Sequence, residues 1–386
     1  MKILGIFLNN ELRTGGHIRC LELMEGLAQR GNKVTVLLNS ALQYKAHCFS
    51  EVRLAAPYKR KSIPPASMVF KRSTKAWLDT GRLEEKPDFV LIFGEAHLRA
   101  AIEVKRRFCV PILFGLQSNS VRETLNSIKE NALLPHKLIG ALFDLLRCKI
   151  YEARIARSCD AIIFQSSFDR DEFQSRNRKV AGRSYVIPGN IGPPRFTEES
   201  RGLNRSDAVR KILFMGTLGE RKGLRYLFQA FDILHSEGRQ GLELHVAGPG
   251  TDEQRARFER YAAKHGFAGS VTFYGRVPST FPLMTDCDIM IAPSLFDSFP
   301  DVVLLAFHVG IPVLGSRVGG IPDMLKHDDL LFPPRDGAAI AAVLRRCLDE
   351  PGRYAALRIL SAERRAHFLF DWSAKWESVA AEAFRK

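Results

Sequence analysis

The segment with the most evident chemistry is Gly216-Thr-Leu-Gly-Glu-Arg-Lys-Gly223, a glycine-flanked turn between a short apolar run and a helical pattern. Its two cations, Arg221 and Lys222, stand where the helix is expected to begin. Cations at that end oppose the helix dipole by roughly 0.3 to 1 kcal/mol each unless an anion joins them. A phosphate group would satisfy both the cations and the N–H groups of the first helical turn. The turn therefore indicates either a phosphate site or an exposed turn with two solvated charges.

An acidic residue marks a second constellation, which runs from Pro293 to Val313. Ser298 stands three residues before Asp301, with Pro300 between them, which is a variant of the capping box. We therefore expect a helix to open at this point and to end at Val309. Asp297 is left in the loop ahead of the helix, where its carboxylate either contacts a ligand or serves only in capping.

These two segments, together with Gly319-Gly320-Ile-Pro-Asp323, resemble the donor domain of the family 4 retaining glycosyltransferases. The family pattern has a strand, a glycine, a loop ending in Lys-Gly, then Pro-Ser, two acidic residues eight apart, Gly-x-Pro-Val and Gly-Gly-x-Pro. The resemblance covers nearly the whole chain. Gly15-Gly16 is similar to the family's N-terminal glycine loop, Val186 to Phe196 to its interdomain segment, and Phe370-Asp-Trp372 to the start of its closing helix.

The resemblance implies an α/β protein of the GT-B fold, with two Rossmann-like doubly wound domains facing across a cleft. Residues 1–187 would form the acceptor-binding domain, on which the closing helix 372–386 packs back, and residues 188–371 the donor-binding domain. The implied reaction moves a sugar from a UDP- or GDP-sugar to a lipid-linked, lipopolysaccharide or polysaccharide acceptor, with retention. It needs no metal or other cofactor, because an Arg/Lys pair and a helix dipole neutralise the leaving diphosphate.

The resemblance also assigns roles to single residues. Lys222, with Arg221, would hold the donor diphosphate, and Asp297 would meet the sugar hydroxyls, assisted by the backbone after it. The segment Tyr274 to Val277 would contact the base. The full set comprises Asp297 and Gln117 as catalytic residues; Gly16, Gly216, Arg221, Lys222, Gly248, Arg276, Val277, Ser298, Phe299 and Leu305 on the donor side; and Arg13, Gly15 and His17 on the acceptor side.

Three positions depart from the family pattern. The second acidic position, which clamps the ribose in the family, is Leu305; a common Arg is Thr217; and a common His is Gln117, which hydrogen-bonds but carries no charge. One lost charge-assisted contact weakens a site by about 1.5 to 3 kcal/mol. A non-catalytic GT-B homologue acting as a partner or regulatory subunit is therefore the alternative. An epimerase or a dinucleotide oxidoreductase is a third, although the first loop lacks G-x-G-x-x-G.

Strand-like runs alternate with helical patterns throughout, which predicts parallel sheets covered by helices. In the first half, Ile18, Leu21, Met24, Leu27 and Ala28 recur at helical spacing. The Pro- and Gly-rich stretch 187–196 predicts a linker. The expected strands are 2–8, 33–38, 89–93, 112–116, 161–164 and 184–187 before it, and 211–215, 242–247, 270–274, 289–291 and 312–315 after it.

Length and composition favour two globular domains in a reducing compartment. The chain has 386 residues, more than one ordinary domain. Its seven cysteines form no C-x-x-C pair and are expected to be small core residues. No run approaches the roughly 18 apolar residues of a membrane span, and the first apolar run is too short for a signal peptide. We therefore expect a cytoplasmic protein.

Positive charge is concentrated in the first half of the chain. Residues 1–190 contain 31 Lys and Arg against 18 Asp and Glu, a net +13, whereas the rest adds only +2 to the total of +15. The segments 58–61 and 71–75 are basic, and 133–150 mixes apolar residues with cations. Peripheral attachment to anionic lipid on the inner face of the cell membrane fits these segments, as does an ordinary solvated face. Nucleic acid is not expected, because no helix-turn-helix or interleaved aromatic pattern is present.

Overall fold

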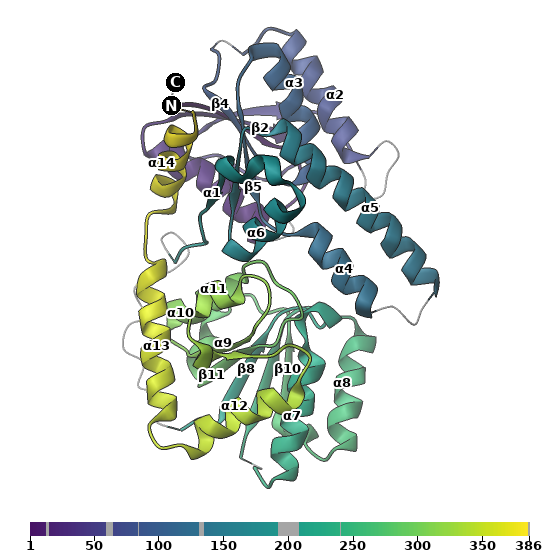
Figure 1. Ribbon diagram of the computed structural model, residues 1–386, viewed down its shortest axis with the longest axis vertical. Helices are drawn as coiled ribbons and strands as arrows, with labels where there is room; N and C mark the ends of the chain where they lie inside the picture. Colours follow the sequence, from purple (N-terminus) through teal and green to yellow (C-terminus); the bar gives the residue numbers. More distant parts are fainter. Residues whose placement is uncertain are drawn as a thin grey trace. The chain divides into compact units, whose positions relative to one another are not determined.

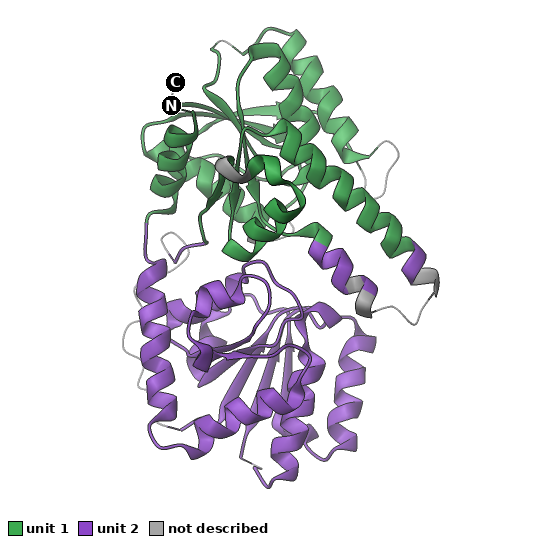
Figure 2. Ribbon diagram, in the orientation of Figure 1, with its two compact units in different colours: residues 1–121, 140–188, 371–386 green, residues 122–139, 189–370 purple. Residues whose placement is uncertain are grey.

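The computed structural model describes residues 1–12, 15–58, 65–83, 85–130, 135–191, 208–239 and 241–384 (Figure 1). They form two compact units (Figure 2). The first comprises residues 1–121, 140–188 and 371–386, and the second comprises residues 122–139 and 189–370. Arg13, the basic residues 59–61 and the second half of the expected linker, residues 192–196, lie outside the described residues.

The first unit is built on a parallel sheet in the order β3-β2-β1-β4-β5-β6-β7. Its central strands are apolar along their whole length, and β4 is buried at every residue, as expected when helices cover both faces. The strands are β1 (Lys2–Phe7), β2 (Lys33–Asn39), β3 (Ser50–Leu54), β4 (Phe89–Phe93), β5 (Ile112–Leu116), β6 (Ala161–Phe164) and β7 (Ser184–Val186).

Helices pack on both faces of this sheet (Figure 1). On one face α1 (Gly15–Gln29) lies against the C-terminal α14 (Trp372–Phe384). Arg30 fixes α14 through Asp371 and Glu377, at 2.8 and 2.7 Å. The other helices of the unit are α2 (Ala66–Asp79), α3 (Leu98–Phe108), α5 (Pro135–Ser158) and α6 (Ser167–Arg176), and α4 (Ser120–Glu130) leads from this unit into the segment that groups with the second.

The second unit has a parallel sheet in the order β10-β9-β8-β11-β12-β13. Its strands are β8 (Lys211–Met215), β9 (Glu243–Ala247), β10 (Val271–Gly275), β11 (Ile289–Ala292), β12 (Val313–Ser316) and β13 (Leu331–Phe332). Its helices are α7 (Leu224–Ser236), α8 (Asp252–Lys264), α9 (Phe281–Asp286), α10 (Asp301–Val309), α11 (Ile321–Leu325), α12 (Gly337–Asp349) and α13 (Arg353–Phe368).

Both sheets are doubly wound, so each has one point where the strand order reverses. In the first unit this point lies between β1 and β4, and in the second between β8 and β11. Open α/β sheets bind ligands outside the carboxyl ends of the strands at such points. The loops after β1, β8 and β11 are therefore the places to examine for a site.

The expected strands all form, with ends that differ by at most one residue from the predicted ones. The sequence missed β3, a largely polar edge strand, and the two-residue β13. Two smaller expectations were wrong. Ile18 is exposed and not on the buried face of α1, and Cys48 and Cys109 are exposed while the other five cysteines are buried.

Candidate functional site

The loop after β8 places Arg221 and Lys222 at the switch point of the second sheet. It runs through a single 3-10 turn, Glu220–Lys222, to Gly223, which caps α7 with a left-handed backbone of φ 67°. A Cβ at Gly223 would lie 1.9 Å from the carbonyl oxygen of Pro293. Only glycine fits this turn, because any side chain would push the β8 loop away from the β11 loop.

The cations converge on Asp297, which follows β11. The Nζ of Lys222 lies 2.5 Å from Oδ2 of Asp297, and the guanidinium of Arg221 lies 3.6 Å from the same oxygen. The Lys222 and Asp297 side chains are 14% and 11% exposed, so water screens their charges only weakly. Leu295 N–H also donates to the carbonyl of Arg221 at 2.8 Å. Two loops 75 residues apart in sequence thus form one charged cluster.

Gly319 and Gly320 hold the backbone of Asp297 from the other side. The N–H of Gly320 donates to the carbonyl of Asp297 at 3.0 Å. Gly319 has a φ of 54°, and a Cβ there would lie 2.0 Å from the same carbonyl oxygen. The Gly-Gly pair of the sequence motif therefore serves to let the β12–α11 turn press against the loop that carries the carboxylate.

Glycines also lie at the carboxyl ends of β8 and of the two strands on its other side, β9 and β10. Gly216 N–H donates to Ala247, and Gly248 N–H donates to Gly275, at 2.9 and 2.7 Å. A Cβ at Gly248 would lie 1.9 Å from the carbonyl oxygen of Gly216. These contacts hold the ends of β8, β9 and β10 together through their backbones, and the Lys222 side chain lies against Gly216. Exposed Arg276 and half-buried Val277 follow directly after β10.

The residues after Asp297 differ from the sequence expectation. The helix α10 begins at Asp301 with Pro300 as its N-cap, so Ser298 is not at the N-cap position that the expected capping box requires. Ser298 is buried in the loop ahead of the helix. Phe299 is buried and packs edge-on against Phe368, which leaves only its backbone for a ligand. Leu305 is half-buried and packs against the hydrophobic core of the unit.

One carboxyl at this cluster was not anticipated. Glu123 of α4, in the segment that groups with the second unit, lies 4.0 Å from the guanidinium of Arg221. Burial raises the pKa of Glu123, and the charge of Arg221 acts in the opposite direction. No local motif surrounds Glu123 in the sequence, and its contact depends on tertiary structure, so sequence reasoning had no signal for it.

The candidate residues of the first unit come together at the ends of β1 and β5. Gln117 follows β5, and its amide nitrogen donates to the carbonyl of Gly16 at 2.8 Å. A Cβ at Gly16 would lie 2.5 Å from the Gln117 side-chain oxygen, so the contact requires glycine. His17 lies beside Asn9 at 3.4 Å and edge-on to Phe7. Gly15 begins α1, and Arg13 lies outside the described residues.

A buried histidine, His97, packs against the end of β1 next to this cluster. His97 stacks between Phe7 and Phe70, accepts from the N–H of Leu8 at 3.0 Å, and contacts the carbonyl of Phe93 at 2.6 Å. Its Nδ1 therefore carries the proton. Burial lowers the pKa of His97 to about 4, so the ring is neutral at pH 7. His97 fixes the end of β1 and has no exposed atom to offer a substrate.

The charged residues of the second unit, which we call the second cluster, have the chemistry for an anionic ligand that also carries hydroxyl groups. Arg221 and Lys222 supply charge-assisted donors for phosphate oxygens, and Asp297 supplies an acceptor for hydroxyls. Gly16, His17 and Gln117 of the first unit, which we call the first cluster, offer neutral donors and acceptors. Within the described ranges, no group of three or more His, Cys, Asp and Glu side chains is arranged to hold a metal ion.

Two family descriptions match the chain. Residues 13–191 match Glycosyltransferase Family 4, and residues 209–350 match Glycosyl transferases group 1. An uncharacterized glycosyltransferase of Methanocaldococcus jannaschii is 28% identical over 228 residues, which cover 56% of this chain and 57% of that one. The glycogen synthase of Mycobacterium tuberculosis is 28% identical over 225 residues, 57% of this chain and 53% of that one. The chain thus spans about half the length of these curated relatives.

Solved structures resemble the chain over nearly its full length. A sucrose-phosphate synthase of Thermosynechococcus elongatus has a TM-score of 0.77 at 19% identity and covers 99% of this chain and 98% of its own. Anabaena HepE in complex with UDP-glucose has a TM-score of 0.70 at 14% identity and covers 99% of both chains. WaaG, a glycosyltransferase involved in lipopolysaccharide biosynthesis, has a TM-score of 0.71 at 16% identity and covers 100% of both. At these identities the likeness shows the fold alone.

Proposed function

Because the chain belongs to the GT-B glycosyltransferases of the family 4 type, we propose that it moves a sugar from a nucleotide-diphosphate sugar to a lipid-linked, lipopolysaccharide or polysaccharide acceptor. The observation that carries this proposal is the convergence of Lys222 and Arg221 on Asp297 at the switch point of the second sheet. We assign the donor to this unit and the acceptor to the first.

The charged cluster suits the departure of a nucleotide diphosphate. When the bond between the anomeric carbon and the diphosphate oxygen breaks, negative charge accumulates on the phosphate. Lys222 and Arg221 stabilise that charge, and the low exposure of Lys222 strengthens its effect. This arrangement supports departure of the diphosphate without a bound metal ion.

Asp297 is assigned to the transferred sugar. In the free protein its carboxylate neutralises Lys222 and Arg221. A donor diphosphate takes over that neutralising role, and the carboxylate then accepts hydrogen bonds from sugar hydroxyls. Ser298 and the backbone of Phe299 complete the donor side, and the backbone at Gly216 and Gly248 is assigned to the phosphate and the nucleoside.

The remaining parts of the site are assigned by position. Arg276 and Val277 follow β10, where a base would contact mainly the backbone, and Leu305 replaces an acidic ribose contact. In the first unit Gln117, Gly15, Gly16, His17 and Arg13 would meet the acceptor and the transferred sugar. The donor nucleotide is UDP or GDP; the UDP-glucose bound by HepE supports UDP. Retention rests on the family type.

The acceptor is proposed to be presented at the inner face of a membrane. Residues 1–190 carry a net +13, which favours an anionic surface. The involvement of WaaG in lipopolysaccharide biosynthesis agrees with such an acceptor. No helix in the described part of the chain has the length and apolar character needed to cross a bilayer. The proposed association is therefore peripheral.

A non-catalytic homologue is the second candidate, because Leu305 stands where an acidic ribose contact is expected. The test incubates the parent protein with UDP-, GDP- and ADP-sugars, measures binding by calorimetry, and then follows release of free nucleotide diphosphate. The proposal predicts binding of at least one donor class and slow release that Asp297→Asn reduces. Binding without any release in the presence of membrane lipid extract, or no binding of any of the three donors, would contradict the transferase proposal and favour the non-catalytic homologue.

A further inference from the structure

Half of α5 presents an apolar face to solvent. Of the ten large hydrophobic side chains that are exposed among the described residues, five lie on this one helix. Phe143 is the most exposed of the ten, at 71%. The remaining five are spread over the rest of the chain, so the concentration on α5 needs an explanation. The five are Ile139, Leu142, Phe143, Leu146 and Ile150, with exposures of 51–71%.

Helical geometry places these five side chains in a single stripe. Their spacing of three and four residues keeps them on one face of a helix with 3.6 residues per turn. The stripe is about 16 Å long, from Ile139 to Ile150, at 1.5 Å per residue. The opposite face holds Cys148, Glu152 and Ile155, which are buried against the first unit. Exposure of the stripe is thus the outcome of how α5 packs.

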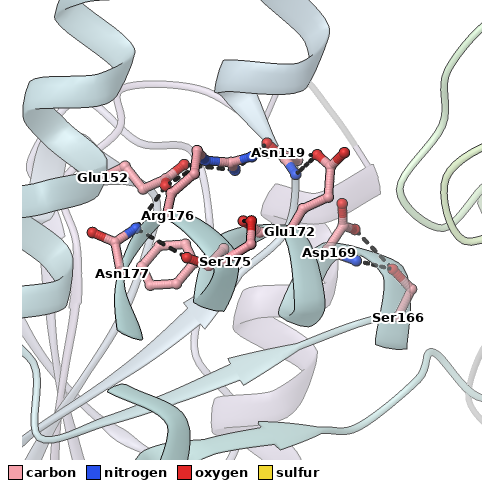
Figure 3. A network of polar contacts seen from close by, with 9 residues as sticks. Asn119, Glu152, Ser166, Asp169, Glu172, Ser175, Arg176 and Asn177 are labelled. Atoms are coloured by element: carbon pink, nitrogen blue, oxygen red, sulfur yellow. Dashed lines mark hydrogen bonds and ion pairs between the residues drawn. The ribbon is translucent and has the colours of Figure 1, made fainter. Parts of the chain in front are cut away.

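The C-terminal half of α5 is held rigidly by a polar network (Figure 3). Glu152 accepts two hydrogen bonds from the guanidinium of Arg176, at 2.8 and 2.9 Å, and one from Asn177 at 2.7 Å. Asn119 bridges to Glu172, which also pairs with Arg176. Because these partners come from α6 and the loop after β5, they fix the rotation of α5 about its axis and hence the direction of the stripe.

Cations flank and continue the stripe. Exposed Arg147 and Lys149 lie on its two sides, and Arg147 is paired with Asp144 at 2.8 Å. Arg154 and Arg157 follow at the same helical spacing. Arg154 opens onto a groove of about 320 Å³ between α2, α3 and α5, where Lys71, Arg99 and Arg106 surround one acid, Glu103. Apolar side chains that grade into cations match the interface of an anionic bilayer, with acyl chains beneath and phosphates above.

We infer that α5 docks the protein on an anionic lipid bilayer, with the stripe inserted at the level of the upper acyl chains and the groove cations at the headgroups. A second copy of the chain fits the stripe less well. A stable protein interface uses roughly 20–30 residues a side, whereas the stripe offers five, and Arg147 and Lys149 of two copies would face each other. This inference supplies the surface on which the proposed lipid-linked acceptor would be met, and in that respect rests on the proposed function.

The test is co-flotation of the full chain, without donor, with phosphatidylcholine vesicles that contain or lack phosphatidylglycerol. The parent is expected to float with the anionic vesicles and, above about 0.15 M salt, to keep only part of its binding, because screening weakens the cations and leaves the stripe. The double variant Phe143→Gln, Leu146→Gln is expected to lose binding at least about tenfold, as is usual for removing buried apolar area. Phe143→Leu should retain it.

The matched control is Ile359→Gln with Leu369→Gln, which removes two equally exposed apolar side chains, at 63% and 51%, from the second unit. It should float as the parent does. Equal losses in the stripe and control variants, or unchanged binding of the stripe variant, would overturn the inference. So would a parent that is dimeric by light scattering when the stripe variant is monomeric. Donor binding is measured separately on the same variants and should not change, so failure here is distinguishable from failure of the proposed function.

Discussion

The two units present different kinds of groups at corresponding positions of their sheets. In the second unit, the loops at the switch point carry Lys222, Arg221 and Asp297; the Lys222 and Asp297 side chains are largely shielded from water, whereas the Arg221 side chain is exposed. In the first unit, the start of α1 and the loop after β5 carry Gly16, His17 and Gln117, and the buried, neutral His97 packs nearby on Phe7. Among the described residues, the second unit thus presents an ion-paired cluster at its switch point, and the first presents a glycine, an imidazole and an amide.

This difference has a physical basis in charge burial. A charge with little access to water is stable only when it is paired, and Asp297 pairs Lys222 in this way. In the proposed function, a ligand phosphate takes over that role. Neutral hydrogen-bonding groups carry no such requirement, so the first cluster can be rebuilt around different acceptors. Adding or removing a charge in either cluster tests this difference between the two units.

The largest effect is expected from Asp297→Asn. Loss of a charged acceptor for the sugar should lower donor turnover by about 10- to 100-fold, which corresponds to about 1.5–3 kcal/mol. The same change removes the carboxylate that competes with phosphate for Lys222, so bare UDP or GDP should bind up to about tenfold more tightly. Calorimetry and a nucleotide-release assay measure the two effects. Asp286→Asn is the matched control and should change neither; Asp286 ends α9 and pairs with Lys211, at the amino end of β8, at 2.9 Å.

Acidification should destabilise the first unit through His97. Its folded-state pKa of about 4 lies below the ordinary 6.5, so between these values the unfolded chain binds a proton that the folded chain does not. Stability is therefore present above pH 6.5 and is lost as pH falls towards 4, by about 2 kcal/mol between pH 7 and 5.

All three tryptophans, Trp77, Trp372 and Trp376, belong to the first unit, so their fluorescence during urea unfolding reports on it. His97→Gln should have a shallower pH dependence than the parent. Exposed His47→Gln should keep the parental slope. The same slope in His97→Gln and the parent would mean that His97 does not stay neutral.

A smaller effect is expected at Gln117. Gln117→Ala removes one neutral hydrogen bond to the Gly16 carbonyl and should cost about 1 kcal/mol in tryptophan-monitored unfolding. Gln117→Glu keeps the size but sets a carboxylate against that carbonyl, with no donor between them, and should cost more. Nucleotide affinity, assigned to the second unit, should be the same in both variants. If Glu is tolerated better than Ala, the first cluster is not restricted to neutral groups.

The smallest effect concerns Leu305. An apolar side chain near the ribose leaves no buried acceptor to be unpaired, so a 2′-deoxy donor should bind within about 1 kcal/mol of the ribo form. Leu305→Glu should restore a preference for the ribo donor. The comparison is made by competition binding with both donors. Strong discrimination by the parent would show that another residue holds the ribose.

Most of the fold could be predicted from the sequence, because the central strands are buried on both faces of their sheet and therefore appear in the sequence as continuous apolar runs. It failed at β3, whose residues Ser-Glu-Val-Arg-Leu form an edge strand defined by pairing with β2 and not by burial. At the site, the motifs located Lys222 and Asp297 singly. Their contact could not be read from a separation of 75 residues; it follows from β8 and β11 being neighbours in the sheet.

The capping box illustrates a boundary that local spacing does not define. Ser298 and Asp301 have the right spacing for one, and a helix does form there, but it begins at Asp301 with Pro300 as its N-cap. Glu123 was missed because it reaches Arg221 from a helix with no motif of its own.

Whether Lys222 binds the donor diphosphate is tested by calorimetric titration of UDP and GDP into Lys222→Ala and Lys264→Ala. Lys264 is exposed at the C-terminal end of α8. This end of the helix leads back to the amino ends of the strands, whereas the β8 loop lies at their carboxyl ends. If Lys222 binds the diphosphate, its removal should weaken the tighter-binding nucleotide by about 1.5 to 3 kcal/mol, while Lys264→Ala binds as the parent does. Equal affinity of Lys222→Ala and the parent would contradict the account.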